Sequence, residues 1–252
     1  MKIIVATHNE GKLAEIRRIL EERLGADAAD IELVSAGSLG LPDPVEDGVT
    51  FQENALIKAR DVAERTGCPA VADDSGLIVD VMGNAPGILS ARWAGEHGND
   101  KANNALLLKQ LADIPDSKRT ARFRCAAALV VPDTEASADV TGGVAADGIT
   151  VYTTAADGSP APVHARYAIK SETVELGDMP GRIIREARGV HGFGYDPLFV
   201  PDYQPAGRVS TEPDHEGEPL TSAEMTPAEK NAISHRGKAL KALVPAIEAL
   251  LH

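Results

Sequence analysis

The sequence has few cysteines, few aromatic residues and no long apolar run. Its two cysteines, Cys68 and Cys125, lie far apart and outside any CxxC pair, which excludes a disulfide scaffold and favours small buried apolar side chains. A membrane span needs about 20 consecutive apolar residues, and the apolar run 2–6 is too short even for the core of a signal peptide. We therefore expect a protein of the reducing cytoplasm with no membrane partner.

Basic residues are also scarce relative to acidic ones. There are 25 Lys and Arg against 38 Asp and Glu, a formal net charge of −13, which argues against nucleic acid as a partner because phosphate backbones are bound by basic patches. Residues 126–164 contain five acids and no Lys or Arg, and residues 201–224 contain six acids against one arginine. Two loop-rich insertions, at about 133–162 and 201–225, therefore carry most of the net charge, and we interpret them as solvated surface segments.

The rest of the composition is that of a folded domain. Hydrophobic residues make up 43% and charged residues 25%, and 252 residues suffice for one large domain or one domain of two lobes. Strands and helices alternate early and strands cluster in the middle, which predicts an α/β or α+β fold with a large mixed sheet. The expected strands are 2–6, 31–35, 69–72 and 76–82 on either side of a turn, 121–132, 149–153 and 163–176. The expected helices are 13–24, 50–66, 99–112, one that starts at Thr226, and 237–251.

A short polar segment joins the first strand to the first helix. It reads Thr7-His8-Asn9-Glu10-Gly11-Lys12. Small and polar residues let the backbone approach a ligand, the helix N-terminus offers free N–H groups to an anion, and Lys12 adds a point charge for phosphate. The alternative is a plain polar turn in which Asn9 caps the helix, and a Walker loop is excluded because GxxxxGK[ST] does not occur.

Two adjacent acids, Asp73 and Asp74, lie between apolar stretches and are followed by Ser75 and Gly76. Carboxylates in such a place are costly to bury unless they are paired or bind a metal, and hard oxygen ligands suit Mg²⁺. Because neighbouring residues of a strand point to opposite faces, we expect one acid to face the metal and the other to serve the structure. The alternative is a turn with solvated acids.

Two aromatic residues lie in a glycine-rich segment, Gly192-Phe193-Gly194-Tyr195-Asp196-Pro197. Aromatic residues are only 4% of the chain, so a pair of them beside glycines predicts a tight loop with exposed rings that stack on a nucleobase. A structural turn that packs Phe193 into the core is the alternative.

The start of the last helix is basic. Ser234-His235-Arg236 follows Lys230, which provides a forked donor, a point charge and an imidazole that can donate or accept at a base edge. Cations at a helix N-terminus oppose the macrodipole, which favours a nearby ligand anion over the alternative of a plain surface helix.

Five motifs occur in order over nearly the whole chain: TxNxxK, FxENAxxKA, DDSGLxVDxxGxxPGxxSAR, GFGYDPLF and SHRxxAL. Together they resemble the inosine triphosphatase family, the XTP/dITP diphosphatases that remove deaminated purine nucleotides from the nucleotide pool. The resemblance implies an elongated two-lobed α/β fold around a large mixed sheet, an active cleft between the lobes, a homodimer and a Mg²⁺ requirement. It also implies hydrolysis of ITP, dITP or XTP to the monophosphate and pyrophosphate.

The resemblance assigns roles to residues, motif by motif. Asp74 matches the catalytic acid/base and metal ligand, and Glu46, shortly before the FQENA helix, matches a metal-linked acid. Lys58 and Arg92, which alone would indicate surface or packing residues, match positions that line the cleft. The other matches bind substrate: Thr7, His8, Asn9, Glu10, Gly11 and Lys12 as the phosphate loop, Ser75 as a further contact, Phe193, Gly194, Tyr195 and Asp196 as the base pocket, and Lys230, His235 and Arg236 at the base and phosphates.

These roles suggest a mechanism and its rivals. Mg²⁺ on Asp74 and Glu46 would bridge phosphate oxygens, while Asp74 or a metal-bound hydroxide prepares water for attack at the α-phosphorus. His235 and Arg236 would donate to the 6-oxo group of inosine or xanthosine, and ATP would leave these donors unpaired. The alternatives are a nucleoside triphosphate pyrophosphatase of other base specificity and a nucleotide-sensing module without turnover. His8 and the two long acidic segments depart from the family pattern.

Overall fold

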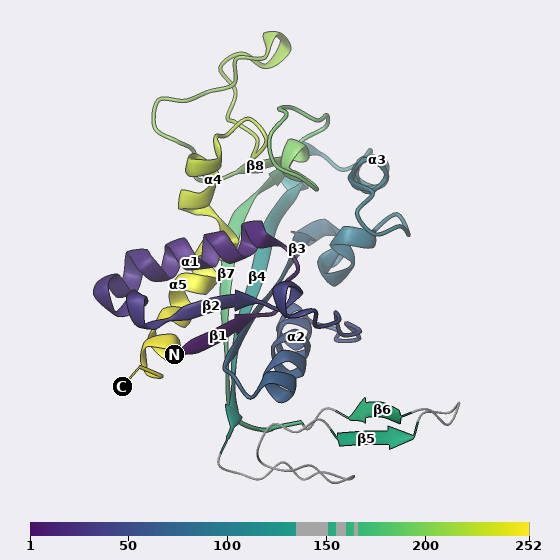
Figure 1. Ribbon diagram of the computed structural model, residues 1–252. Helices are drawn as coiled ribbons and strands as arrows, with labels where there is room; N and C mark the ends of the chain where they lie inside the picture. Colours follow the sequence, from purple (N-terminus) through teal and green to yellow (C-terminus); the bar gives the residue numbers. More distant parts are fainter. Residues whose placement is uncertain (135–150, 155–159, 164–165, 252) are drawn as a thin grey trace.

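The computed structural model describes residues 1–134, 151–154, 160–163 and 166–251. Its main feature is a six-stranded mixed sheet with the order β2-β1-β3-β4-β7-β8 (Figure 1). β1 runs parallel to β2 and β3, and the pairs β3–β4, β4–β7 and β7–β8 are antiparallel, which confirms the large mixed sheet. The strands are β1 (Lys2–Val5), β2 (Glu32–Ser35), β3 (Ala70–Val79), β4 (Thr120–Asp133), β7 (Ala168–Ile183) and β8 (Phe199–Pro201).

Helices cover both faces of the sheet. α1 and α5 pack on one face and α2 on the other (Figure 1). Capping boxes start α2 at Thr50 and α4 at Thr226, where the sequence predicts them. Within the described residues, no helix is long and apolar enough to cross a membrane. The helices are α1 (Glu10–Leu24), α2 (Phe51–Thr66), α3 (Asp100–Gln110), α4 (Pro227–Ile233) and α5 (His235–Glu248), and the 3-10 helix η4 spans Gly87–Arg92.

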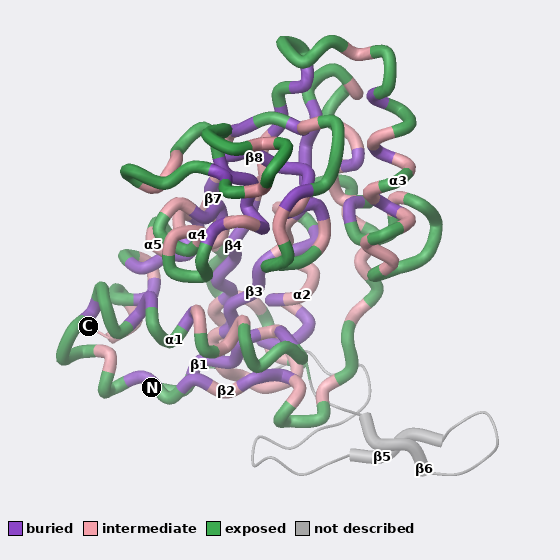
Figure 2. The backbone as a smooth tube through the Cα atoms, turned by 90° about the horizontal axis from the view of Figure 1, so that it is seen from above, coloured by how far each residue is buried: buried purple, intermediate pink, exposed green. Residues whose placement is uncertain are grey.

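The core consists of three apolar clusters. Alternate residues of β3 pack on opposite faces of the sheet. Val71 packs with α1 and α5, whereas the next residue, Ala72, packs with α2. A third cluster, which we call the distal cluster, includes Leu77, Met179 and Phe199 at the other end of the long strands. Figure 2 shows these buried residues along the strands and exposed ones along the loops. The long strands β3, β4 and β7 thus extend from the part of the sheet covered by α1, α5 and α2 into the distal cluster.

β3 is one continuous strand, so the predicted turn between residues 72 and 76 is wrong. All ten of its residues pair with β4 in unbroken register. A Cβ at Gly76 would lie 2.5 Å from the Gly87 carbonyl oxygen and 2.5 Å from Ser90 Oγ. The glycine therefore marks a close approach of η4 to the strand rather than a reversal of the chain.

The two acidic segments differ in structure. Most of residues 133–162 lie outside the described residues, and the described parts include β5 (Val151–Thr154) and β6 (Pro160–Val163), which form an antiparallel pair. In residues 201–225, the only regular structure within this fully described stretch is the end of β8 and the short 3-10 turn η7 (Pro213–His215). The prediction of a loop-rich segment is confirmed there.

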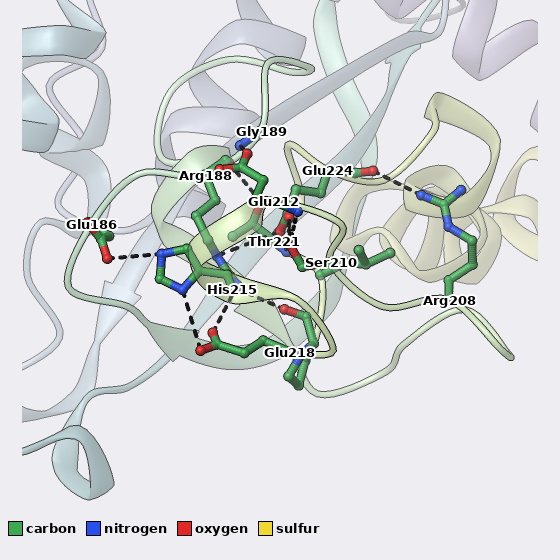
Figure 3. Close-up of polar contacts among 12 residues, drawn as sticks. Glu186, Arg188, Gly189, Arg208, Ser210, Glu212, His215, Glu218, Thr221 and Glu224 are labelled. Carbon is green, nitrogen blue, oxygen red and sulfur yellow. Dashed lines mark hydrogen bonds and ion pairs between the residues drawn. The ribbon is translucent and has the colours of Figure 1, made fainter.

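Two acids of this second segment, Glu218 and Glu224, lie against a buried arginine. Arg188, with 2% of its side chain exposed, donates from Nη1 to Glu218 at 2.9 Å (Figure 3). Glu224 lies 3.8 Å from Arg188 Nε, and Glu212 accepts the N–H of Gly189 at 2.9 Å. The interpretation as solvated surface is confirmed for Asp202, Asp214, Glu216 and Glu218, which are exposed, and is wrong for Glu224, whose side chain is 7% exposed.

Candidate active site

Asp73 and Asp74 are consecutive on β3 and point to opposite faces of the sheet, as the sequence predicts. The Asp73 carboxylate faces α1 and α5. Its Oδ1 accepts a hydrogen bond from the Lys12 ammonium at 3.0 Å, and its Oδ2 accepts one from Nε of Arg236 at 3.1 Å. Burial alone would raise the pKa of Asp73, but the two cations outweigh it and hold this pKa well below its usual range. Asp73 is thus a charged anchor for two side chains of the site.

Asp74 faces α2, which supplies two partners one turn apart. Lys58 Nζ lies 3.3 Å from Asp74 Oδ1, and the Asn54 carboxamide donates to Oδ2 at 3.3 Å. Burial raises the pKa of Asp74, while Lys58 lowers it and the charge of Glu46 raises it, so the net shift is upward. A carboxyl group with a raised pKa accepts a proton more readily, as a general base requires.

The Asp74 and Glu46 carboxylates fit a divalent cation. Both lie 3.3 Å from the ammonium of Lys58, so their oxygens already converge on one positive charge. Among the described residues, no group of three or more His, Cys, Asp and Glu side chains could hold a metal. Two carboxylates suit Mg²⁺, which takes one or two from the protein and completes its shell with water and substrate phosphates.

The predicted phosphate loop is built as a cap on α1. Asn9 is the N-cap, and its Oδ1 accepts the N–H groups of Gly11 at 2.8 Å and of Lys12 at 3.3 Å. Thr7 Oγ1 accepts the N–H of Asn9 at 3.1 Å. Two backbone donors that we expected to be free for an anion are therefore occupied, and the Lys12 side chain is the charged group that this loop presents.

A pocket of about 260 Å³ lies on the α1 and α5 side of Asp73. It brings together Lys12, Phe193 and Arg236, which come from three separate motifs. Cations and an aromatic ring in one pocket are complementary to a phosphorylated base. The other lining residues are Asn9, Gly11, Glu15, Lys230, Asn231, Ser234 and His235.

The two rings of the glycine-rich loop have different environments, so the prediction of two exposed rings is half wrong. Phe193 is 69% exposed beside the pocket, and Lys230 Nζ lies 5.2 Å from its ring centroid. Tyr195 is 4% exposed in the distal cluster, and its hydroxyl donates to the Ser90 carbonyl oxygen at 2.8 Å. Phe193 is therefore the ring that can reach a ligand.

Asp196 closes the same loop. Its buried carboxylate accepts the N–H of Phe193 at 2.9 Å and the ammonium of Lys230. A Cβ at Gly192 would lie 2.1 Å from this carboxylate, which is why the loop needs glycine there. Asp196 thus fixes an aromatic ring and a cation next to each other.

His235 begins α5 and stacks on Phe123, with ring centroids 5.2 Å apart and 17° between the planes. Burial, with the charges of Arg236 and Lys230 nearby, lowers the pKa of His235 to about 3. The imidazole is therefore neutral at physiological pH. Its buried Nδ1 has no hydrogen-bond partner among the described residues.

The two halves of the site meet at an open edge of β3. β1 pairs with β3 only at Ala70 and Val71, so β1 does not cover the part of this edge that carries the two acids. Ser75 lies farther along β3 and donates to Asp73 at 3.4 Å. A ligand that crosses the edge can contact the pocket on one face and Asp74 on the other.

Three predicted ligands have other surroundings. His8 Nε2 lies 3.2 Å from Asp43, and Glu10 accepts the hydroxyl of Ser35 at 2.8 Å. Arg92 ends η4, is exposed, and does not line the pocket. The structure therefore does not bring these three side chains to the acids of β3.

Sequence reasoning missed Glu15 and Phe123. Glu15 accepts Nη1 of Arg236 at 3.2 Å, and its spacing of three residues from Lys12 on α1 was the signal that could have found it. Phe123 reaches His235 only because β4 passes beneath α5, and nothing local in the sequence indicates that contact.

The comparison with known families agrees with this geometry. A model of the Ham1 family matches residues 3–151 and 145–246. The chain belongs to the Ham1 family. Its motifs and its mixed sheet are thus those of a family, and the resemblance found in the sequence is confirmed.

Relatives of this Ham1 chain carry consistent names. It is 91% identical over 252 residues to the dITP/XTP pyrophosphatase of Bifidobacterium longum (strain NCC 2705), which covers 100% of both chains. It is 44% identical over 250 residues to the protein of that name from Leifsonia xyli subsp. xyli, with coverage of 99% of this chain and 97% of the relative.

Solved structures share the fold. The nucleoside-triphosphatase / dITP/XTP pyrophosphatase from Mycobacterium abscessus has a TM-score of 0.65 and 42% identity, covering 97% of this chain and 100% of that one. A HAM1 protein from Coxiella burnetii has a TM-score of 0.68 and 34% identity, covering 99% of each chain. The α/β fold of this Ham1 chain is therefore that of its family.

Proposed function

We propose that this chain hydrolyses deaminated purine nucleoside triphosphates, namely ITP, dITP and XTP, to the monophosphate and pyrophosphate. The observation that carries the proposal is the convergence at the open edge of β3, with Lys12 and Arg236 on one face and Asp74 with Lys58 on the other. The names of relatives that match the chain over its whole length support the same reaction.

In this reaction the base occupies the pocket beside Phe193 and His235, and the triphosphate crosses the edge of β3. Lys12 then meets phosphates on one face, and Lys58 meets them on the other. Cations that are held in place before the substrate arrives stabilise the charge that develops on the leaving pyrophosphate.

Asp74 is the proposed general base. It takes a proton from the water that attacks the α-phosphorus, because its carboxylate lies at the edge of β3 that the triphosphate crosses. Asp74 and Glu46 would hold Mg²⁺, which supplies charge neutralisation at the phosphate oxygens when it is bound. Lys58 keeps the two carboxylates close to each other.

Base selection follows from hydrogen-bond direction. Inosine and xanthosine carry an acceptor at position 6, where adenosine carries an amino donor. An Arg236 donor directed at this oxygen would be left unpaired by ATP, and such a mismatch discriminates by about 10⁴-fold or more. The neutral His235 adds a second polar group in the pocket wall.

We further propose that the chain forms a homodimer and works in the cytoplasm. The resemblance to the inosine triphosphatase family supports the dimer, and the net charge of −13 supports the expectation that nucleic acid is not a partner. Light scattering after size exclusion tests the assembly: twice the chain mass is expected, and a monomer at assay concentration would contradict it.

Pyrophosphate release from a panel of triphosphates tests the reaction. ITP, dITP and XTP are expected to react much faster than ATP and TTP, which lack the 6-oxo purine acceptor. Comparable rates on ITP, ATP and TTP would contradict the deaminated-purine assignment and favour a pyrophosphatase of other base specificity. Nucleotide binding without any pyrophosphate release would favour a sensing module.

A further inference from the structure

Helix α3 holds the glycine-rich loop at one residue. Asp100 Oδ2 accepts the N–H of Gly194 at 2.7 Å, and Asn104 Nδ2 donates to the Gly194 carbonyl oxygen at 3.0 Å. The two side chains are one helical turn apart and lie on the same side of α3. Both backbone polar groups of Gly194, whose φ is +61°, are therefore bound by one helix.

Helix α3 is also held by contacts other than those of Asp100 and Asn104 with Gly194. Leu107 is fully buried in the distal cluster. Asn103 accepts the N–H of Ala94 at 2.7 Å, and Trp93 Nε1 donates to Gln110 at 2.9 Å, so α3 is also tied to the end of η4. The two side chains that reach the loop therefore act on the loop rather than on the docking of the helix.

Asn104 has a destabilising feature that an apolar side chain at the same position would not have. Its Oδ1 is buried and has no hydrogen-bond partner among the described residues. A buried acceptor without a partner is destabilising, and an apolar side chain of similar size would avoid the loss. The favourable contribution of this carboxamide is therefore the hydrogen bond that its Nδ2 donates to the Gly194 carbonyl oxygen.

We propose that Asp100 and Asn104 are positioning residues for recognition of the nucleobase, an inference that rests on the proposed function for the nature of that base. By fixing Gly194 on both sides, they set the place of Phe193, which lines the pocket, and of Asp196, which holds Lys230. Glycines at positive φ leave a loop many other conformations, and the two bonds to Gly194 favour the one that places the Phe193 ring at the pocket.

The test uses Asp100→Ala and Asn104→Leu in the full chain, with Lys109→Ala on an exposed position of the same helix as the matched control. Hydrogen exchange of residues 190–196 is expected to be at least about tenfold faster in both variants and unchanged in the control. For ITP, KM is expected to rise about tenfold with kcat within about threefold. Asp100→Asn, whose carboxamide oxygen can still accept, is expected to restore most of the wild-type KM.

Two further readouts separate loop positioning from general damage. Inhibition by inorganic tripolyphosphate, which has no base, is expected to stay within about twofold of wild type because Lys12 and Lys58 are held by the acids of β3 and not by this loop. The emission of Trp93, the only tryptophan, is expected to stay unchanged because it reports on the contact between η4 and α3. Equal losses for ITP and tripolyphosphate, or a shifted Trp93 emission, would overturn the proposal.

Failure of the proposed function would be visible separately. If the wild-type protein did not prefer ITP over ATP, the deaminated-purine assignment would fail, while hydrogen exchange of residues 190–196 would still decide the role of α3. Unchanged exchange in Asp100→Ala would overturn the positioning role whatever the substrate is.

Discussion

Asp73 and Asp74 share a peptide bond and yet belong to opposite faces of one sheet. Asp73 binds the cations of α1 and α5, Lys12 and Arg236, whereas Asp74 meets Lys58 of α2. The alternation of side chains along a strand causes this separation. Substitution of each acid by its isosteric amide should therefore have different consequences.

Asp74→Asn is expected to remove activity without loss of stability. The amide keeps the shape of the side chain but cannot take a proton from water, and loss of a general base costs about 10²- to 10⁴-fold in rate. Pyrophosphate release and the urea midpoint should be measured on the same preparation. A folded variant with near wild-type turnover would show that Asp74 is not the base.

Asp73→Asn is expected to lower the free energy of unfolding by about 3 kcal/mol, because Lys12 and the partly buried Arg236 lose their shared counter-charge. Urea denaturation measures the loss, with Asp74→Asn as the control at the adjacent position. Equal midpoints for the two variants would contradict the anchoring role of Asp73.

Glu46→Gln is expected to raise the Mg²⁺ concentration needed for half-maximal activity by about tenfold or more, because one of two carboxylate ligands is lost. A Mg²⁺ titration of activity measures this shift, and a chelator should stop turnover of the wild-type protein. Activity that persists in excess chelator would argue against any metal requirement.

His235 should make stability depend on pH. Its pKa is about 3 in the folded protein against an ordinary value of 6.5, so between these values the unfolded chain binds a proton that the folded chain does not. Stability is therefore complete above pH 6.5 and falls as the pH is lowered, by up to about 1.4 kcal/mol per unit. His235→Gln should lack this component in urea titrations from pH 7 to pH 5. Identical slopes for both proteins would contradict a neutral buried imidazole.

Arg188→Met is expected to destabilise the protein by about 3 kcal/mol, since Arg188 is buried and holds the second acidic segment through Glu218. Arg185→Met is the matched control, because its ion pair with Asp116 is exposed and such pairs contribute about 0–1 kcal/mol. Thermal unfolding of both variants compares them directly, and similar losses would show that the Arg188 network is no stronger than a surface pair.

Much of the fold could be predicted because its signals are local. Thr50 and Thr226 mark helix starts through their capping boxes, and the apolar runs at residues 2–6 and 121–132 correspond to strands. The continuity of β3 through Gly76 could not be predicted. A glycine that follows three polar residues indicates a turn unless one knows that η4 packs against it.

Some features of the site could likewise be predicted from the sequence, and others could not. The charges of Lys12 and Arg236 could be assigned from motifs, and the structure places both in the pocket. The burial of Tyr195 and the contact between Phe123 and His235 depend on which elements pack together, and no spacing in the sequence encodes that.

The cations of the site are already partnered before any substrate arrives. Lys12 and Arg236 share Asp73, Lys58 lies between Asp74 and Glu46, and Lys230 holds Asp196. These four cations face the four carboxylates of Asp73, Asp74, Glu46 and Asp196, so the protein does not have to fold around a cluster of unopposed positive charge.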